Sequence, residues 1–377
     1  MKPRSVVGIE LFSGCGGLST GFLDAGLHVA AGFEWEARAV DVYNYNHAYR
    51  GSVGVRYDLS EAKGRDLLSV AGVRKIDFLI GGPPCQPFSI AGKRKGTQDE
   101  RASLLDHYVR FVRELKPEAF LLENVPNLAT IDGGEILKGV VQRLRRLGYG
   151  LRYEVVKAAD FGVPQMRKRL VMVGIHGKPE IEFPEPTHGE GLTSYVTVRD
   201  AIGDLPDAGE FGETGIHNHE PTAHSDQMIK RFQQLPQGKR ERFSFHDRLH
   251  PDKLSYTLRA GYGNFSPLRP IHHTYHRVIT ARESARLQGL SDDFIWPDRI
   301  PRLQQYRQVG NAVPPPLAKA FGQCIAKQMG WKLEVAKCKG DPSNREAPMV
   351  MTDDQRRAQR HSRTRGASLG KFLIAAE

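Results

Sequence analysis

The sequence of 377 residues predicts an α/β protein, in which a doubly wound, mostly parallel sheet domain carries a smaller, irregular second domain. Three observations lead to this prediction. Strand-like and helix-like segments alternate up to about residue 175, as they do in repeated strand–helix units. The periodicity then disappears between residues 178 and 276, where Pro, Gly, His and Thr are frequent. Helix-like segments return between residues 277 and 330.

The alternating part divides into short apolar runs and longer segments with helical spacing. Stop signals support the helices, because one is closed by Gly26, one stops before Pro117 and one ends at Gly148. The apolar runs predict buried strands at 6–14, 28–36, 75–82, 119–125 and 169–175. The longer segments predict helices at 16–27, 37–47, 103–115 and 133–148.

Two more helices are predicted near the end of the chain, in segments 280–290 and 313–330. Thr280 is a plausible N-cap of the first, and the second has Pro in its first turn. The composition therefore predicts these parts: 1–177, 178–276, 277–330 and a basic, disordered tail over 331–377.

Composition excludes several classes of protein. No stretch approaches the roughly 20 apolar residues of a membrane helix. The N-terminus lacks the apolar core and cleavage site of a secretory signal, so we expect a cytoplasmic protein. The four cysteines (Cys15, Cys85, Cys324 and Cys338) show no metal-ligand spacing, so we expect neither a disulfide framework nor a metal site.

Positive charge is concentrated in one part of the chain. The formal net charge is +11, and residues 228–277 hold ten Lys and Arg against three acidic residues. The stretch before it, residues 180–226, is acidic. General solubility would explain the net charge, but this change of sign favours a localised face for a polyanion. Nine of the 14 histidines lie between His188 and His276, where phosphate contacts are preferred over a metal site.

A glycine-rich turn, FSGCGG, joins the first predicted strand to the first helix. Such a turn lets the backbone and the helix amides approach a ligand, although dinucleotide enzymes use one too. Glu34 ends the second strand, where an acidic residue can bind ribose hydroxyls or be an ordinary surface carboxylate. Asp58 is equally a ligand of an adenine amino group or a helix cap, and Trp35 could cover an adenine ring. Trp296 is expected to be a packing residue.

The segment GGPPCQPFS is more specific. It follows a predicted strand, so Cys85 lies in a loop at the ligand edge of the sheet. Three prolines stiffen this loop, which suits a nucleophile that is held at a fixed angle. A buried structural cysteine is the commoner role of a free thiol, but it would not need such a loop.

Two polar motifs follow at neighbouring strands. Glu123, in the segment ENV, ends a strand beside the cysteine loop and could protonate a group to which sulfur adds. In QMRKR, Gln165, Arg167 and Arg169 alternate along a predicted strand and would project from one face. This face suits an anion or an electron-rich base, although an edge strand with solvated arginines would show the same pattern.

Together these segments resemble the DNA cytosine-5 methyltransferase family over roughly residues 6–330. FSGCGG is similar to its S-adenosylmethionine loop, GGPPCQPFS to its nucleophile loop, and ENV and QMRKR to its cytosine-pocket motifs. RVITARESARLQGL and YRQVGNAVPPPLAKA are similar to its two C-terminal motifs. Cys15 departs from the family, which often has an apolar residue there.

The resemblance implies a Rossmann-like methyltransferase sheet domain that transfers a methyl group from S-adenosyl-L-methionine to carbon 5 of a flipped-out cytosine. Cys85 would add to carbon 6, Glu123 would engage N3, and Arg167 would contact the O2 side, with Arg169 and Gln165 in support. Residues 178–276 would be the target-recognition domain, and 277–330 would pack back on the catalytic domain. The cofactor site would comprise Phe12, Ser13, Gly14, Gly16, Gly17, Glu34, Trp35, Asp58, Pro83, Leu104, Asn311 and Ala312. The DNA contacts would comprise Ser89, Arg101, Arg231, Lys239, Arg240, Arg242 and Arg259.

The expected partner is double-stranded DNA, bound by a monomer that pairs functionally with a restriction endonuclease of the same specificity. An RNA cytosine-5 methyltransferase of the same fold is the nearest alternative. An inactive, DNA-binding relative would not need Cys85 and Glu123. An NAD-dependent oxidoreductase would explain only the first glycine turn.

Overall fold

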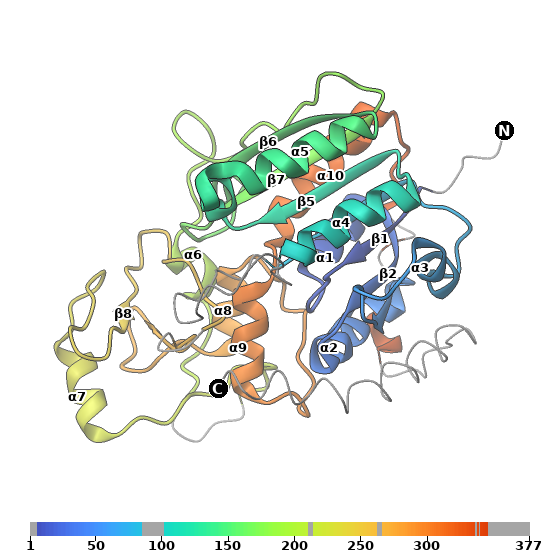
Figure 1. The fold of residues 1–377 in the computed structure, drawn as a ribbon. Coiled ribbons are helices and arrows are strands. Elements are labelled where there is room, and N and C mark those ends of the chain that lie inside the picture. Colours follow the sequence, from blue (N-terminus) through green and yellow to red (C-terminus); the bar gives the residue numbers. More distant parts are fainter. Residues whose placement is uncertain are drawn as a thin grey trace, which may run out of the picture. The chain divides into compact units, whose positions relative to one another are not determined.

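The computed structural model describes residues 6–84, 102–209, 214–261, 266–335, 338 and 340–345 (Figure 1). The chain forms two compact units. The first contains residues 1–156, 168–184 and 319–377, and the second contains 157–167 and 185–318. Residues 277–318 thus belong to the second unit, whereas the sequence had grouped 277–330 as one segment.

A seven-stranded sheet forms the centre of the first unit, in the order β3-β2-β1-β4-β5-β7-β6. The five strands β3, β2, β1, β4 and β5 run parallel, and β7 pairs antiparallel with β5. This confirms the predicted α/β class with a mostly parallel sheet. The strands are β1 (Val7–Leu11), β2 (His28–Glu34), β3 (Val53–Arg56), β4 (Phe78–Gly81), β5 (Ala119–Asn124), β6 (Tyr149–Lys157) and β7 (Lys168–His176).

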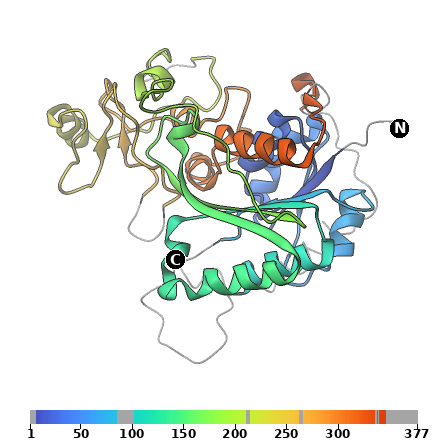
Figure 2. The same cartoon turned by 90° about the horizontal axis from the view of Figure 1, so that it is seen from above.

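Helices cover both faces of this sheet. On one face, apolar residues of α3, α4 and α5 share a buried cluster with Ile9, Leu11 and Leu122 of the strands. On the other face, Phe22 of α1 packs against Phe78 of β4, with 5.4 Å between ring centroids. Figure 2 shows α5 and α10 on opposite sides of the sheet. The helices are α1 (Gly17–Ala25), α2 (Ala37–His47), α3 (Gly64–Ala71), α4 (Ala102–Leu115), α5 (Glu135–Arg146) and α10 (Pro315–Met329).

The second unit has short elements joined by long loops. Its core includes Trp296, whose ring nitrogen donates to Gln308 Oε1 at 2.9 Å, so this tryptophan has the predicted packing role. Thr280 caps α8 as predicted, because its hydroxyl accepts from the Glu283 amide while the Glu283 carboxylate accepts from the Thr280 amide. The elements are α6 (Val198–Ile202), α7 (Asp226–Gln234), β8 (Asp247–Arg248), β9 (Pro270–Ile271), α8 (Ala281–Leu287) and α9 (Arg302–Asn311).

Single-turn 3-10 helices join several of these elements. They are η1 (Ala48–Arg50), η2 (Pro126–Ala129), η3 (Ile131–Gly134), η4 (Ala158–Phe161) and η5 (Pro342–Asn344). No helix within the described part of the chain is long and apolar enough to cross a membrane.

Candidate functional site

Four parallel strands of the first unit end at the same edge of the sheet. Leu11 of β1 pairs with Phe33 of β2 and with Gly81 of β4, and Gly81 pairs with Leu122 of β5. The segments that follow these residues therefore leave the sheet side by side. All four carry predicted site residues: the glycine turn after β1, Glu34 at the end of β2, the turn before Cys85 after β4, and Glu123 near the end of β5.

The turn after β1 has an unusual backbone. Phe12, Gly14 and Gly16 all have positive φ, at 56°, 54° and 95°. At Gly16 a side chain would also meet the His47 ring, since a Cβ there would lie 2.4 Å from its Cε1 atom. Gly14 instead faces open space, because a Cβ there would have no atom within 4 Å. The turn therefore leaves room for a ligand beside Gly14.

Glu34 is held by the backbone around it. Its Oε2 accepts from the Gly14 amide at 2.9 Å, and its Oε1 accepts from the amides of Trp35 and Glu36 at 2.7 and 2.9 Å. Burial raises the pKa of Glu34 above its usual range, and these hydrogen bonds oppose the rise. A carboxylate oxygen has more than one acceptor position, so Glu34 can bind a hydroxyl without losing these contacts.

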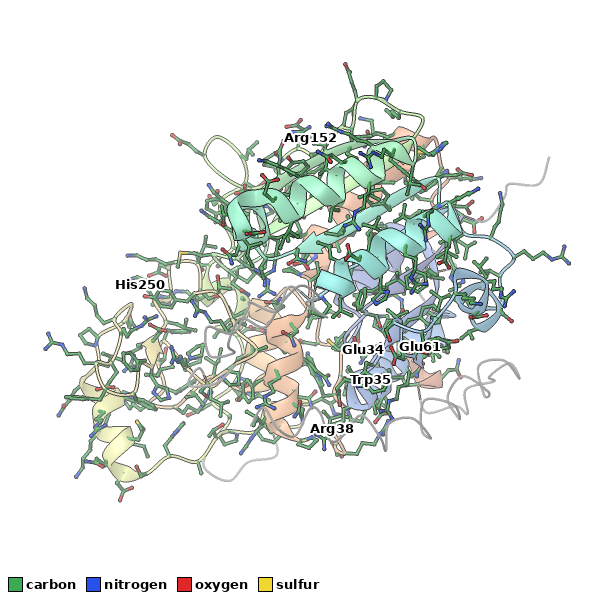
Figure 3. The ribbon with its side chains drawn as sticks, in the orientation of Figure 1. Glu34, Trp35, Arg38, Glu61, Arg152 and His250 are labelled. Carbon is green, nitrogen blue, oxygen red and sulfur yellow. The ribbon has the colours of Figure 1, made fainter. Side chains whose placement is uncertain are left out.

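The other predicted cofactor residues of the first unit lie close by in the sequence or at the same sheet edge. Figure 3 shows Glu34 and Trp35 side by side, near the start of α2. The Arg56 guanidinium lies 5.1 Å from the centre of the Trp35 ring. Asp58 follows β3, and its Oδ1 accepts from the amide and hydroxyl of Ser60, which gives it a turn-capping role. Leu104 lies in the first turn of α4.

Two features of this cradle fit an adenosyl group. Ser13 is buried, and its hydroxyl has no hydrogen-bond partner among the described residues. The hydroxyl is therefore available to a polar group of a ligand. A turn with a purely structural role would be expected to pair such a buried hydroxyl within the protein. The glycine turn and the anchored carboxylate also lie at the edge where such sheets bind nucleosides.

A carboxylate and a guanidinium meet at the next strand. The Nε atom of Arg169, on β7, lies 2.8 Å from Oε1 of Glu123 on β5, and both side chains are only about one-tenth exposed. Gly82 packs beside the second carboxylate oxygen, because a Cβ on Gly82 would lie 3.1 Å from Glu123 Oε2. Burial lowers the pKa of the Arg169 guanidinium from its usual range, and Glu123 opposes that shift. The pair is thus a partly desolvated ion pair beside the turn that leads to Cys85.

Asn124, which was not among the predicted site residues, connects β5 to that same turn. Its Nδ2 donates to the carbonyl of Pro83 at 2.9 Å, and its Oδ1 accepts from the Val125 amide. Successive side chains on a strand point to opposite faces, so Glu123 and Asn124 reach different neighbours. The sequence did hold a signal for this role, because Asn124 carries a side-chain amide and directly follows Glu123 at the end of the predicted strand. Cys85, Ser89 and Arg101 lie outside the described residues.

Gln165 and Arg167 differ from Arg169 in their surroundings. They precede β7 instead of lying on it, and they belong to the second unit, so the three predicted residues do not form one strand face. Arg167 is 1% exposed and donates to the carbonyls of Leu258, Gly310 and Ala312. Gln165 is fully buried and bonds to the carbonyl of Leu287, the side chain of Gln288 and the amide of Leu258.

Asn311 and Ala312 lie at the end of α9 in the second unit. The Ala312 carbonyl is one of the acceptors of Arg167, while Asn311 is exposed. Their predicted contact with a cofactor stays a prediction.

The cations of the basic segment are of two kinds. Arg248 and Arg277 are buried and serve the fold, Arg248 through carbonyls such as that of Phe232 and Arg277 through Glu283 and Asp207. The predicted DNA contacts are more accessible: Arg231 is half-buried, while Lys239, Arg240, Arg242 and Arg259 are exposed. Arg240 also pairs with Asp247 at 2.6 Å.

The histidines of the second unit serve mainly in packing and hydrogen bonding where the structure describes their surroundings. Within the described ranges, no group of three His, Cys, Asp or Glu residues could hold a metal ion. His219 is buried and bonds to Thr280 and to the Pro206 carbonyl, and His272 is buried against His273 and Tyr275. The phosphate role expected for these loop histidines is therefore wrong for His219 and His272, because packing has enclosed both rings.

Comparisons with known proteins agree with this arrangement. The model of the family "C-5 cytosine-specific DNA methylase" matches residues 6–327. The type II methyltransferase M1.HphI of Haemophilus parahaemolyticus is 38% identical, covering 86% of this chain and 87% of its own length. M.XorII of Xanthomonas oryzae is 36% identical, covering 87% and 86%. A solved structure of an E. coli prophage protein, assigned as a DNA modification methyltransferase, is 29% identical, with a TM-score of 0.74 over 86% of this chain and 100% of that one.

Proposed function

Because this chain belongs to the C-5 cytosine-specific DNA methylase family, it is a DNA cytosine-5 methyltransferase, and we propose that it acts through a covalent bond between Cys85 and a flipped-out cytosine. The observation that supports this most is the contact between the Cys85 turn and the end of β5. Gly82 packs on Glu123, and the Pro83 carbonyl accepts from Asn124.

In the proposed reaction, the Cys85 thiolate adds to carbon 6 of cytosine and the ring electrons move toward carbon 5. Carbon 5 then takes the methyl group, its proton leaves to a base, and the bond between sulfur and carbon 6 breaks. Both faces of the ring must be reached in turn, so the cytosine leaves the base stack, at a cost of a few kcal/mol.

Glu123 and Arg169 hold the base in this proposal. The Glu123 carboxyl group is oriented by Arg169 through its Oε1. Cytosine N3 takes up a proton as sulfur adds to carbon 6, and Glu123 Oε2 accepts the hydrogen bond from the protonated N3. We assign the contact on the O2 side to Arg169 instead of Arg167, because three backbone carbonyls already engage Arg167 in a site closed to solvent. Gln165 and Arg167 then support the backbone that leads into β7.

We propose S-adenosyl-L-methionine as the cofactor, which supplies an electrophilic methyl group on sulfonium sulfur. Glu34 would bind the ribose hydroxyls, and the turn from Phe12 to Gly17 would receive the amino-acid part. Trp35 would lie along the adenine ring and Asp58 near its amino group. Pro83, Leu104, Asn311 and Ala312 complete the proposed lining.

The substrate that we propose is a specific sequence in duplex DNA, read by a monomer, and the chain would be the modification enzyme of a type II restriction–modification system. Two relatives above 35% identity carry the name type II methyltransferase, which favours DNA over RNA. The exposed cations of the second unit, together with Ser89 and Arg101, would contact the DNA backbone.

The test uses a duplex in which 5-fluorocytosine replaces cytosine, at a site mapped by bisulfite sequencing of DNA from an expressing host. We expect the full chain and cofactor to form a denaturation-resistant complex with it. Cys85→Ala should abolish this complex, whereas Cys324→Ala, at a half-buried cysteine on α10, should retain it. A complex that persists with Cys85→Ala would contradict the nucleophile assignment. Faster methylation of tRNA than of duplex DNA would favour the RNA alternative.

A further inference from the structure

The second unit contains a hydrogen-bonded hairpin over residues 238–248. The Gly238 amide donates to the Arg248 carbonyl at 2.8 Å, and the Arg248 amide donates to the Lys239 carbonyl at 2.9 Å. Arg240 and Asp247 form an antiparallel bridge, and their side chains make a two-point ion pair at 2.6 and 3.1 Å. These contacts fix the two arms of the hairpin.

The hairpin is anchored to the core of this unit. The buried Arg248 guanidinium donates to the carbonyls of Phe232, Leu235 and Thr274. The strand β8 also pairs with β9, and Phe232 and Ile271 belong to a small buried apolar cluster. The tip of the hairpin therefore projects from arms that Arg248 and β8 attach to the core of the unit.

The tip of the hairpin is ordered by Glu241. Its Oε2 accepts from the amides of Phe243 and Ser244 and from the Ser244 hydroxyl, and its amide donates to the His246 carbonyl at 2.8 Å. These hydrogen bonds hold the pKa of the Glu241 carboxyl below its usual range. The Glu241 carboxylate therefore points toward the backbone of the tip, and its negative charge is compensated by the amide groups there.

Two phenylalanines project from this ordered tip. Phe243 is 80% exposed and Phe245 is 50% exposed. Single exposed apolar residues are common on protein surfaces. Here, however, two aromatic side chains lie close together on a hydrogen-bonded hairpin tip. An exposed aromatic side chain on an ordered backbone, such as that of Phe243, suits contact with a partner that has flat apolar surfaces.

Cations surround the aromatic tip. Arg231 lies 5.9 Å from the Phe243 ring centre, and Arg269 lies 5.7 Å from that of Phe245. Lys239 and Arg242 are exposed on the hairpin itself. A flat apolar side chain that has cations around it is complementary to base pairs, which have phosphates on either side.

We propose that the hairpin 238–248 enters a groove of duplex DNA, where Phe243 wedges against base pairs while Arg231 and Arg242 bind the flanking phosphates. This inference rests on the proposed DNA substrate and adds to it the residue that touches bases. Phenylalanine can contact the methyl group of thymine or part a base step, so Phe243 contributes to the choice of sequence.

The test compares Phe243→Ala, Phe243→Trp and Arg242→Ala in the full chain, with a duplex that contains the mapped site. We expect Phe243→Ala to raise the Kd and KM for DNA about 10-fold, with an unchanged KM for the cofactor and an unchanged salt slope. Phe243→Trp, which keeps a flat ring, should restore most of the affinity. Arg242→Ala should instead reduce the salt slope of log K by about one.

Tyr153→Ala is the matched control, because it removes an exposed aromatic side chain from β6 of the other unit. It should leave the Kd for DNA unchanged. The inference is overturned if Phe243→Ala binds DNA within twofold of the wild type, or if it lowers the salt slope as Arg242→Ala does. If the wild type methylates DNA in that same experiment, the proposed function stands even when the hairpin inference fails. Failure of the hairpin inference can therefore be told apart from failure of the proposed function.

Discussion

Two arginines that lie two positions apart in the sequence have opposite environments. Arg167 is closed off from solvent, and backbone carbonyls accept its hydrogen bonds. Arg169 faces the Glu123 carboxylate at the sheet edge. Alternation along a strand predicted the same face for both, because the sequence does not show that the strand begins only at Lys168.

Replacing each of these arginines by Met should separate a catalytic role from a structural one. Arg169→Met leaves Glu123 without its cation, so we expect kcat to fall at least 100-fold, at a cost in stability of about 1–3 kcal/mol. Arg167→Met leaves several buried carbonyls without a donor, so we expect a larger loss of stability, about 3 kcal/mol or more. Thermal unfolding and kcat, measured on both variants, check this.

Arg169→Lys extends the comparison, because it retains the charge but not the planar guanidinium. It should recover part of the lost kcat. The assignment is wrong if Arg167→Met folds as well as the wild type and loses more activity than Arg169→Met.

At the scale of elements, apolar runs predicted β1, β2, β4, β5 and β7 in the right order. Within the first unit, β3, α3 and β6 had not been predicted from the sequence. β3 has only four residues, and β6 has Arg152, Tyr153, Glu154 and Val155 exposed in succession, so neither gives an alternating or continuous apolar signal. The antiparallel direction of β7 was also beyond the sequence, since direction depends on the path of the chain between strands.

Part of the candidate site was predictable at this scale, because parallel strands end at a common edge. The positions of Glu34 and Glu123 at strand ends follow from that rule. The hydrogen bond between Asn124 and Pro83 does not, because it joins residues 41 positions apart through a single side chain. The pairing of Arg169 with Glu123 likewise depends on the register between β5 and β7.

Asn124 should act as a positioning residue for the cysteine turn. Asn124→Ala removes the donor to the Pro83 carbonyl, so the turn can sample other positions. We expect kcat to fall about 10–100-fold, while the KM for the cofactor stays within about twofold. Asn124→Asp tests the donor specifically, because a carboxylate keeps the size but cannot donate.

Initial rates and the yield of the 5-fluorocytosine complex give the readout for these variants. Loss of rate with a slower formation of the complex supports positioning of Cys85. An unchanged rate of complex formation in both variants would contradict it.

At the scale of the molecule, net charge overstates the proposed DNA-binding surface. Two of the ten cations in residues 228–277, Arg248 and Arg277, are buried in internal contacts, and Arg240 is paired with Asp247. The charge pattern of the sequence predicts a basic face within residues 228–277, but it could not show which cations hold the fold. That distinction needs the hydrogen bonds of each guanidinium.

The stability of the whole protein should also respond to the charge of a buried acid, Glu10. This β1 residue is 2% exposed, and its carboxylate accepts from the amide and hydroxyl of Ser19, whose hydroxyl bonds to Tyr43. Burial raises the pKa of Glu10 to about 8, against 4.5 ordinarily; the Ser19 hydrogen bonds oppose the shift, and the charges of Glu34 and Glu123 add to it. The folded state therefore keeps a proton that the unfolded chain releases above pH 4.5.

Because Glu10 keeps its proton in the folded state in this window, its own contribution to the free energy of unfolding should fall as pH rises from about 4.5 to about 8. Glu10→Gln removes the titration and keeps an acceptor for the Ser19 amide. Its stability relative to the wild type should therefore increase by a few kcal/mol between pH 5 and pH 8. Urea unfolding at pH 5, 6.5 and 8 measures this, with Glu61→Gln, an exposed acid labelled in Figure 3, as the control that follows the wild-type profile. A Glu10→Gln profile parallel to that of the wild type would show that Glu10 is ionised in the folded protein throughout this range.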